Sequence, residues 1–188
     1  HHRLQNFVAD APWPDAQVRR IAAHHALTAM QKRAPVQTWI CDDTSFPKSG
    51  HHSVGVQRQY CGALGKVANC QVAPSLVVAT AYAHVPIDMT LYLGPDWADD
   101  PARRAEARIP DDVGFKTKPE LMLALIERAR KGGIPPGIVL GDSAFGDNRA
   151  FRHGVRAQNL HYILGVHLST SVCRKSKQST VAPQRIEQ

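Results

Sequence analysis

Paired cysteines, long apolar runs and acidic charge are scarce in this chain, and each shortage excludes a class of protein. The four cysteines, Cys41, Cys61, Cys70 and Cys173, form no CxxC pair, so the chain has neither a zinc-finger spacing nor a dense disulfide framework. No run of about 18 apolar residues occurs, and the first residues hold no apolar segment of signal-peptide length. The sequence therefore predicts a cytoplasmic, soluble protein with buried free thiols.

The charge balance is basic. Lysine and arginine number 23 against 16 acidic residues, a formal net charge of +7 over 188 residues. Hydrophobic content of 43% and charged content of 21% are globular values. The excess of positive charge favours a polyanionic partner such as nucleic acid, although many basic proteins bind none.

Hydrophobic periodicity and breaker residues divide the chain into a helical lead-in (residues 1–35), a core (36–167) and a polar tail expected to be disordered (168–188). Strands are predicted over 36–43, 69–83, 85–94, 134–142 and 160–166, and helices over 14–33, 118–133 and 147–159. Residues 44–66 are expected to be a loop or a weak hairpin, and residues 95–112 a charged surface connection.

The resulting order, β-β-β-α-β-α-β after a helical lead-in, indicates an α/β fold with a mixed sheet. The ribonuclease H-like fold has this order, and its first and fourth strands are parallel neighbours. In that fold the carboxyl ends of residues 36–43 and 134–142 would lie side by side.

An aspartate follows each of those two apolar strands. Asp42 comes after Trp39-Ile40-Cys41, and Asp142 comes after the run Ile138 to Gly141. The carboxyl edge of an open α/β sheet is where ligands bind. Two carboxylates side by side repel each other unless a cation lies between them, and oxygen ligands select Mg²⁺ or Mn²⁺. For either aspartate alone, a turn or a helix N-cap is the competing interpretation.

The stretch WICDDTSFPKSGHHSVGVQRQYCGALGKVANCQV resembles the catalytic segment of DDE transposases of the IS701 type, with its D-D-T-x-F-P-K-x-G, V-G-V-x-R-Q-Y-C-G and N-C-Q-V motifs. The blocks LYLGPDWADDPARRAEARIPDDVGFKTKPEL and VLGDSAFGDNRAFR are similar to later parts of that family, so that the likeness covers residues 1–167.

This resemblance implies a ribonuclease H-like endonuclease and strand transferase that uses divalent metal, two Mg²⁺ or Mn²⁺ ions in the intact enzyme. By motif, Asp42 and Asp142 are the catalytic and metal-binding aspartates, and Asp43 is the weaker candidate for the first. No third acidic residue is identified, because Glu187 has no convincing helical context. We therefore expect a truncated chain with absent or very weak cleavage, from a bacterial, nucleoid-associated protein. Its partners would be transposon-end and target DNA and further copies of itself, with no membrane partner.

Other polar residues carry weaker signals. Nucleic-acid contacts are predicted for a set of basic loop residues, Lys48, Arg58, Lys66, Lys116 and Lys118. The arginines of the charged connection, Arg103, Arg104 and Arg108, are expected on a solvated face. His51 and His52 are expected to be polar loop residues rather than a metal pair, since adjacent side chains in a strand point apart. Trp97 and Tyr60 could stack on bases, but Trp97 is expected to anchor its connection.

Two other functions stay open at this point. A haloacid dehalogenase-like phosphatase would also place an acid after a strand, but it requires a second aspartate where Thr44 stands, and a fully parallel sheet. The second alternative is a transposase remnant that binds DNA without cutting it.

Overall fold

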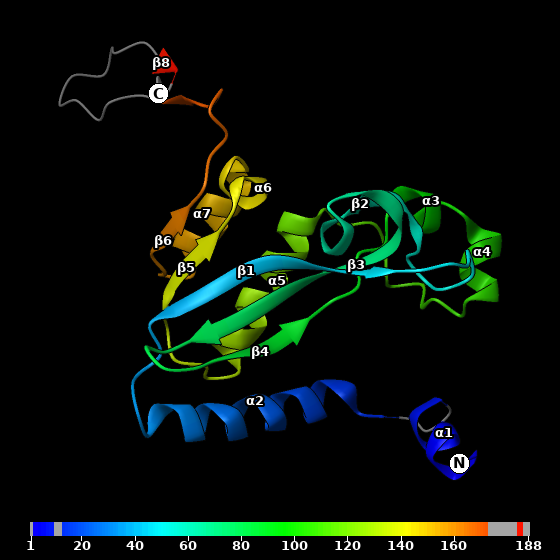
Figure 1. Ribbon diagram of the computed structural model, residues 1–188, viewed down its shortest axis with the longest axis horizontal. Helices are drawn as coiled ribbons and strands as arrows, with labels where there is room; N and C mark the ends of the chain where they lie inside the picture. The colour runs from blue at the N-terminus through cyan, green and yellow to red at the C-terminus, as the bar shows by residue number, and fades with distance from the viewer. Residues whose placement is uncertain (1, 10–12, 173–183, 186–188) are drawn as a thin grey trace.

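A six-stranded mixed sheet with helices packed against it forms the body of the protein (Figure 1). The computed structural model describes residues 2–9, 13–172 and 184–185. Its helices are α1 (His2–Ala9), α2 (Asp15–Gln31), α3 (Pro95–Ala98), α4 (Pro101–Glu106), α5 (Lys118–Lys131), α6 (Ser143–Gly146) and α7 (Arg149–Ala157), with a 3-10 turn at Gly62–Leu64. Its strands are β1 (Thr38–Pro47), β2 (Gln57–Cys61), β3 (Lys66–Ala79), β4 (His84–Met89), β5 (Ile138–Gly141), β6 (Tyr162–Leu164), β7 (Ser171–Val172) and β8 (Gln184–Arg185).

Strand β1 lies at the centre of the sheet, whose order is β2-β3-β1-β5-β6 with β4 also paired to β3. It runs antiparallel to β3 and parallel to β5, and β5 runs parallel to β6. The first and fourth predicted strands are therefore parallel neighbours, and the predicted ribonuclease H-like fold class is confirmed. The antiparallel strands β3 and β4 differ from the fully parallel sheet that a haloacid dehalogenase requires.

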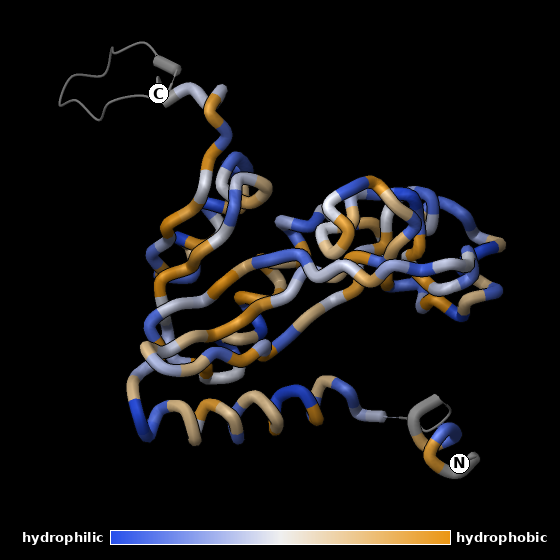
Figure 2. Tube along the Cα trace, viewed as in Figure 1, coloured by the Kyte–Doolittle hydropathy of each residue, from blue (hydrophilic) through white to orange (hydrophobic). Residues whose placement is uncertain are grey.

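The two faces of the sheet are covered very differently. Trp39 and Val139 have no exposed surface, and they pack with Leu125 of α5 and Phe151 of α7. On the opposite face Ile40 and Leu140 are only half-buried, and Ile163 is 66% exposed. We call this second side the open face. The strands β5 and β6 are apolar along their length, as Figure 2 shows.

Local sequence explains where α5 begins and ends. Thr117 and Glu120 form a reciprocal capping box, and Pro119 lies in the first turn, where a missing N–H costs nothing. The helix ends at Gly132 and Gly133, the second of which has a φ of 77° that suits glycine.

Several predicted boundaries were wrong. Strand β1 does not end near Asp42, because its pairing with β3 continues to Pro47 opposite Cys70. The predicted loop over 44–66 contains β2, hairpin-paired to β3, whereas the strand predicted over 85–94 ends at Met89. The helix predicted over 147–159 starts instead at Arg149, after the short α6.

The predicted lead-in helix exists, and its buried face is narrower than its apolar residues suggest. Only Ala23, Leu27 and Met30 are buried, whereas Val18 and Ile21 are exposed. Asp88 of β4 pairs with Arg19 of α2 at 3.4 Å and with Arg128 of α5, which fixes the helix beside this edge strand.

Of the tail predicted to be disordered, residues 173–183 and 186–188 lie outside the described residues; β7 pairs with β8 in an antiparallel ladder. No helix in the described part of the chain is long and apolar enough to cross a membrane.

Candidate active site

The register between β1 and β5 aligns the two predicted aspartates. Cys41 pairs with Gly141 in the parallel ladder, so Asp42, within β1, and Asp142, an extended residue directly after β5, occupy the next position along each chain. Because side chains alternate along a strand and Trp39, Cys41 and Val139 face the helices, both aspartates face the open side. Neighbouring strands lie about 4.8 Å apart, which brings the two exposed carboxyl groups within reach of one small ligand.

Asp142 is fixed where β5 ends. Its Oδ1 accepts a hydrogen bond of 3.0 Å from the Ala144 backbone N–H, capping α6, so the N-cap interpretation holds for this residue. Two glycines let the chain pack tightly here: a Cβ on Gly165 would lie 3.4 Å from Asp142 Cα, and one on Gly146 would lie 1.7 Å from the Gly165 carbonyl oxygen. The cap uses only one carboxylate oxygen.

Asp42 is held within a continuous strand. Its Oδ1 accepts from the Asp43 backbone N–H at 2.8 Å, and its carbonyl oxygen accepts from the hydroxyl of Ser75 at 3.2 Å. In both Asp42 and Asp142 the second carboxylate oxygen accepts no hydrogen bond from the described residues. Each aspartate therefore offers one free oxygen on the open face.

Asp43 faces the other way, toward α5. Its Oδ2 accepts a hydrogen bond from Lys118 Nζ at 2.7 Å, and its Oδ1 is buried with no partner among the described residues. The side chains are 27% and 31% exposed, and the ammonium also lies 5.6 Å from the centre of the Tyr92 ring. Asp43 is thus engaged in an ion pair beneath the sheet, on the opposite face from Asp42 and Asp142.

The donor set suits a hard cation. Carboxylate oxygens select Mg²⁺ or Mn²⁺ over zinc, and the thiol of the neighbouring Cys41 is buried on the other face. Across residues 2–9, 13–172 and 184–185 no group of three or more His, Cys, Asp or Glu side chains is close enough to hold a metal ion. Asp42 and Asp142 would therefore form part of a coordination shell.

The predicted nucleic-acid-binding residues lie on different elements rather than in loops alone. Arg58 is in β2, Lys66 begins β3, and Lys118 begins α5, where it pairs with Asp43. Lys48 follows β1, and Lys116 precedes α5. All except Lys118 are exposed. Strands β1, β2 and β3 extend beyond the point where β5 ends, as an arm on the right of Figure 1, and this arm carries Lys48, Arg58 and Lys66.

Trp97 anchors its connection, as predicted. It is 1% exposed and packs with Val56 and Leu93, and its indole N–H donates to the Val56 carbonyl at 2.7 Å. The guanidinium of Arg103 lies 3.6 Å from its ring centre, which makes that residue part of the anchor rather than only a solvated charge.

Tyr60 is 62% exposed. The cysteines Cys41, Cys61 and Cys70 are free and buried as predicted, and Cys173 lies outside the described residues.

Asp147 has a structural role that was not predicted from the sequence. Asp147 accepts hydrogen bonds from the Thr170 hydroxyl at 2.8 Å and from the His167 backbone N–H at 3.1 Å. These bonds, helped by the nearby charges of His167 and Arg152, hold the pKa of Asp147 below its usual value. Asp147 therefore secures the chain that leaves β6. Its position in GDNR resembles a turn, so no sequence signal indicated this role.

Comparison with known proteins identifies the family of the chain. A family described as "DDE superfamily endonuclease" matches residues 1–188. The chain is also 27% identical over 164 residues to a protein of Microchaete diplosiphon named "Probable transposase for insertion sequence element IS701". That match covers 87% of this chain and 40% of the relative, so the chain spans less than half of the relative's length. Enzymes of this superfamily generally use divalent metal ions. The chain belongs to the DDE superfamily endonucleases.

Proposed function

We propose that this chain supplies two metal-binding carboxylates, Asp42 and Asp142, of a transposase-type site that cuts and joins DNA. One observation carries the proposal: the two aspartates stand at equivalent positions on neighbouring parallel strands, both on the open face. Asp43 is the weaker candidate because its carboxylate is committed to Lys118 on the opposite face.

The roles of the residues follow from their surroundings. When bound, Mg²⁺ or Mn²⁺ would activate the attacking oxygen and stabilise the leaving oxygen of a phosphodiester. Asp42 and Asp142 would hold the metal with their free oxygens, while backbone N–H groups fix the other oxygen of each carboxylate. Exposed Lys48, Arg58, Lys66 and Lys116 would contact DNA phosphates, which positions the duplex without reading its sequence.

A third carboxylate would have to reach the pair from the open face. The opposite face is filled by α5 and α7, whose Leu125, Ile126, Phe151 and Val155 are fully buried. Half-buried Ile40 and Leu140 beside the aspartates are suited to packing under an additional element. We therefore expect the described residues to bind metal but to cleave DNA weakly or not at all, and strand transfer to need the rest of a longer protein.

Metal binding tests the assignment directly. Mn²⁺ titration followed by electron paramagnetic resonance should give an affinity that falls at least about tenfold in Asp42→Asn and in Asp142→Asn. Asp43→Asn is the matched control, since it removes the adjacent charge from the other face, and it should keep the affinity. Equal affinities in all four proteins would refute the metal site.

DNA cleavage separates the enzymatic proposal from the non-catalytic alternative. Supercoiled plasmid incubated with the chain and Mn²⁺ should be nicked weakly or not at all. Robust nicking that is lost in Asp142→Asn would show that two carboxylates suffice and that the expected weakness is wrong. Metal binding with no nicking at any concentration would favour a DNA-binding remnant. Multimer formation on transposon ends and association with the bacterial nucleoid belong to the same proposal.

A further inference from the structure

The outward side of α7 carries an uninterrupted row of basic side chains. Arg149, Arg152, His153 and Arg156 follow each other at the i, i+3, i+4 and i+7 spacing that places residues on one helix face. Phe151 and Val155, on the other side, are buried against the core. At a rise of 1.5 Å per residue the row spans about 10 Å. We call these four residues the basic face of α7.

Acidic residues are missing from this helix. Its sequence, RAFRHGVRA, contains none. Some cations of the longer helices are paired along their own helix, Arg19 with Asp15 at 2.9 Å in α2 and Lys131 with Glu127 at 2.7 Å in α5. In the described part of the chain, no carboxylate oxygen lies within 4.0 Å of an arginine of α7.

The nearest acid does not fill that role. Asp147 is close enough for the charge of Arg152 to contribute to its lowered pKa, but the hydrogen bonds from Thr170 and His167 engage both of its oxygens. The guanidinium of Arg152 donates instead to the Gly146 carbonyl, next to α6. The basic face of α7 therefore keeps its positive charge without an internal counter-charge.

This arrangement works against the helix itself. Arg149 is the first helical residue, and a cation there opposes the helix dipole. Arg152 and Arg156 are like charges four residues apart, a spacing that destabilises a helix. Arg156 itself lies in the last turn, where a cation suits the helix dipole, but helix stability gives no reason for Arg149 or for the like-charge spacing, and a bound polyanion would offset both penalties.

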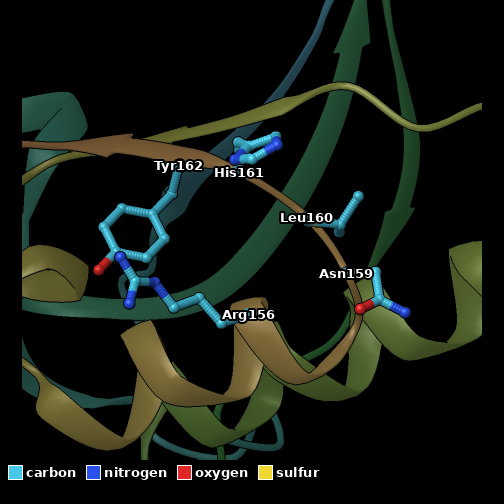
Figure 3. A pocket seen from close by; sticks show the side chains of 5 residues that line it. All are labelled: Arg156, Asn159, Leu160, His161 and Tyr162. Atoms are coloured by element: carbon cyan, nitrogen blue, oxygen red, sulfur yellow. The ribbon is translucent and has the colours of Figure 1, made fainter.

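The row continues into a hollow at the end of the helix. Arg156, Asn159, His161 and Tyr162 line an open hollow of about 560 Å³, with Leu160 at its base (Figure 3). The Arg156 guanidinium lies 5.6 Å from the Tyr162 ring centre, and the same view shows the two side chains next to each other. Asn159, His161 and Tyr162 can each donate a hydrogen bond, so polar groups suited to phosphate oxygens continue past the last turn of α7.

We propose that the basic face of α7 and this hollow bind the sugar-phosphate backbone of duplex DNA. The row starts beside α6, directly after Asp142, and runs away from the sheet edge that holds the aspartates. About three base pairs of duplex rise match its length at 3.4 Å each. The choice of DNA as the polyanion rests on the proposed function, whereas the location rests on the unpaired arginines.

The test compares two double variants of equal charge. Arg149→Gln/Arg156→Gln changes the basic face of α7, and Arg20→Gln/Lys32→Gln removes two exposed cations, one in α2 and one directly after it. Both are made in an Asp142→Asn background and assayed in EDTA, so that the result does not depend on metal or on catalysis. Binding is measured by fluorescence anisotropy with a labelled duplex of about 30 base pairs over a salt series.

Loss of two phosphate contacts should lower the slope of log affinity against log salt by about 1.8 and raise Kd roughly tenfold or more at about 0.1 M salt. The α2 variant should change Kd less than about threefold. Equal losses in both variants would mean that net charge alone matters, and no loss in the α7 variant would also overturn the proposal. The α7 variant should melt close to the parent, because Arg149→Gln removes an unfavourable charge while Arg156→Gln removes both a like-charge neighbour of Arg152 and a favourable last-turn cation; a melting curve of each variant shows that weaker binding is not due to unfolding. Failure of the metal site in the Mn²⁺ titration would leave this result unaffected.

Discussion

Removing the ammonium of Lys118 should destabilise the protein through Asp43. Lys118→Met keeps the length of the side chain but leaves Asp43 facing α5 without a counter-charge. Pairs that are largely exposed are worth about 0.2–1 kcal/mol, and breaking a fully buried pair costs about 3–5 kcal/mol. The two side chains are 27% and 31% exposed, and Asp43 Oδ1 already lacks a partner. We therefore expect a loss of about 2 kcal/mol, or about 4–8 °C in melting temperature for a chain of this size.

Urea unfolding followed by circular dichroism measures this loss in a double-mutant cycle. Asp43→Asn removes the charge that Lys118 neutralises, so the double variant should be close to Asp43→Asn alone, with a coupling energy of about 1–2 kcal/mol. Lys116→Met is the matched control: this exposed lysine has no ion pair in the described structure, and its change should stay within about 0.5 kcal/mol.

The reasoning would be refuted by either of two results. If Lys118→Met unfolds at the same urea concentration as Lys116→Met, the ion pair contributes nothing. If the losses in unfolding free energy of the two single variants add up in the double variant, Asp43 and Lys118 do not interact. Asp43 would then not be held in a structural ion pair.

Two further outcomes follow from the packing around the aspartates. Gly146→Ala should cost about 2–4 kcal/mol, because its Cβ would lie 1.7 Å from the Gly165 carbonyl oxygen, whereas Gly50→Ala, with nothing within 4 Å, should be neutral in the same denaturation assay. Burial, with the charge of Asp42 adding to it, raises the pKa of Cys41 to about 12. In the unfolded chain the Cys41 thiol ionises at a lower pH than in the folded protein. Its contribution to the free energy of unfolding is therefore complete below about pH 9, and it falls by at most about 1.4 kcal/mol per pH unit as the pH rises toward 12. Cys41→Ala should lack this alkaline loss, and identical pH profiles in both proteins would contradict it.

Local signals predicted the elements that have strong local causes. Apolar runs ending in an acid marked β1 and β5, and Pro119 with Gly132 and Gly133 marked both ends of α5. The order of these elements was enough to predict that β1 and β5 are parallel neighbours. The predicted aspartates therefore stand on the same edge of the sheet, and their roles remain a proposal.

Features that depend on distant partners could not be predicted. Polar residues 44–47 look like a loop, but β3 supplies ladder partners that keep β1 extended to Pro47. Val18 and Ile21 fit a helical apolar face, yet only the line through Ala23 and Leu27 meets the core. The pairing of Asp43 with Lys118 joins residues far apart in the chain, and no local pattern indicates it.

The doubled aspartate of β1 makes the strand tolerant of a change that would normally abolish a site. In a strand, a shift of one residue exchanges the two faces, so a single aspartate would be turned away from the open side. With Asp42 and Asp43 adjacent, a one-residue deletion upstream would bring Asp43 to the open face and Asp42 to the buried position of Cys41. Such a deletion would keep a carboxylate on the open face, and its cost would come from the core, where Trp39 would be misplaced and an aspartate buried, rather than from the proposed metal ligands.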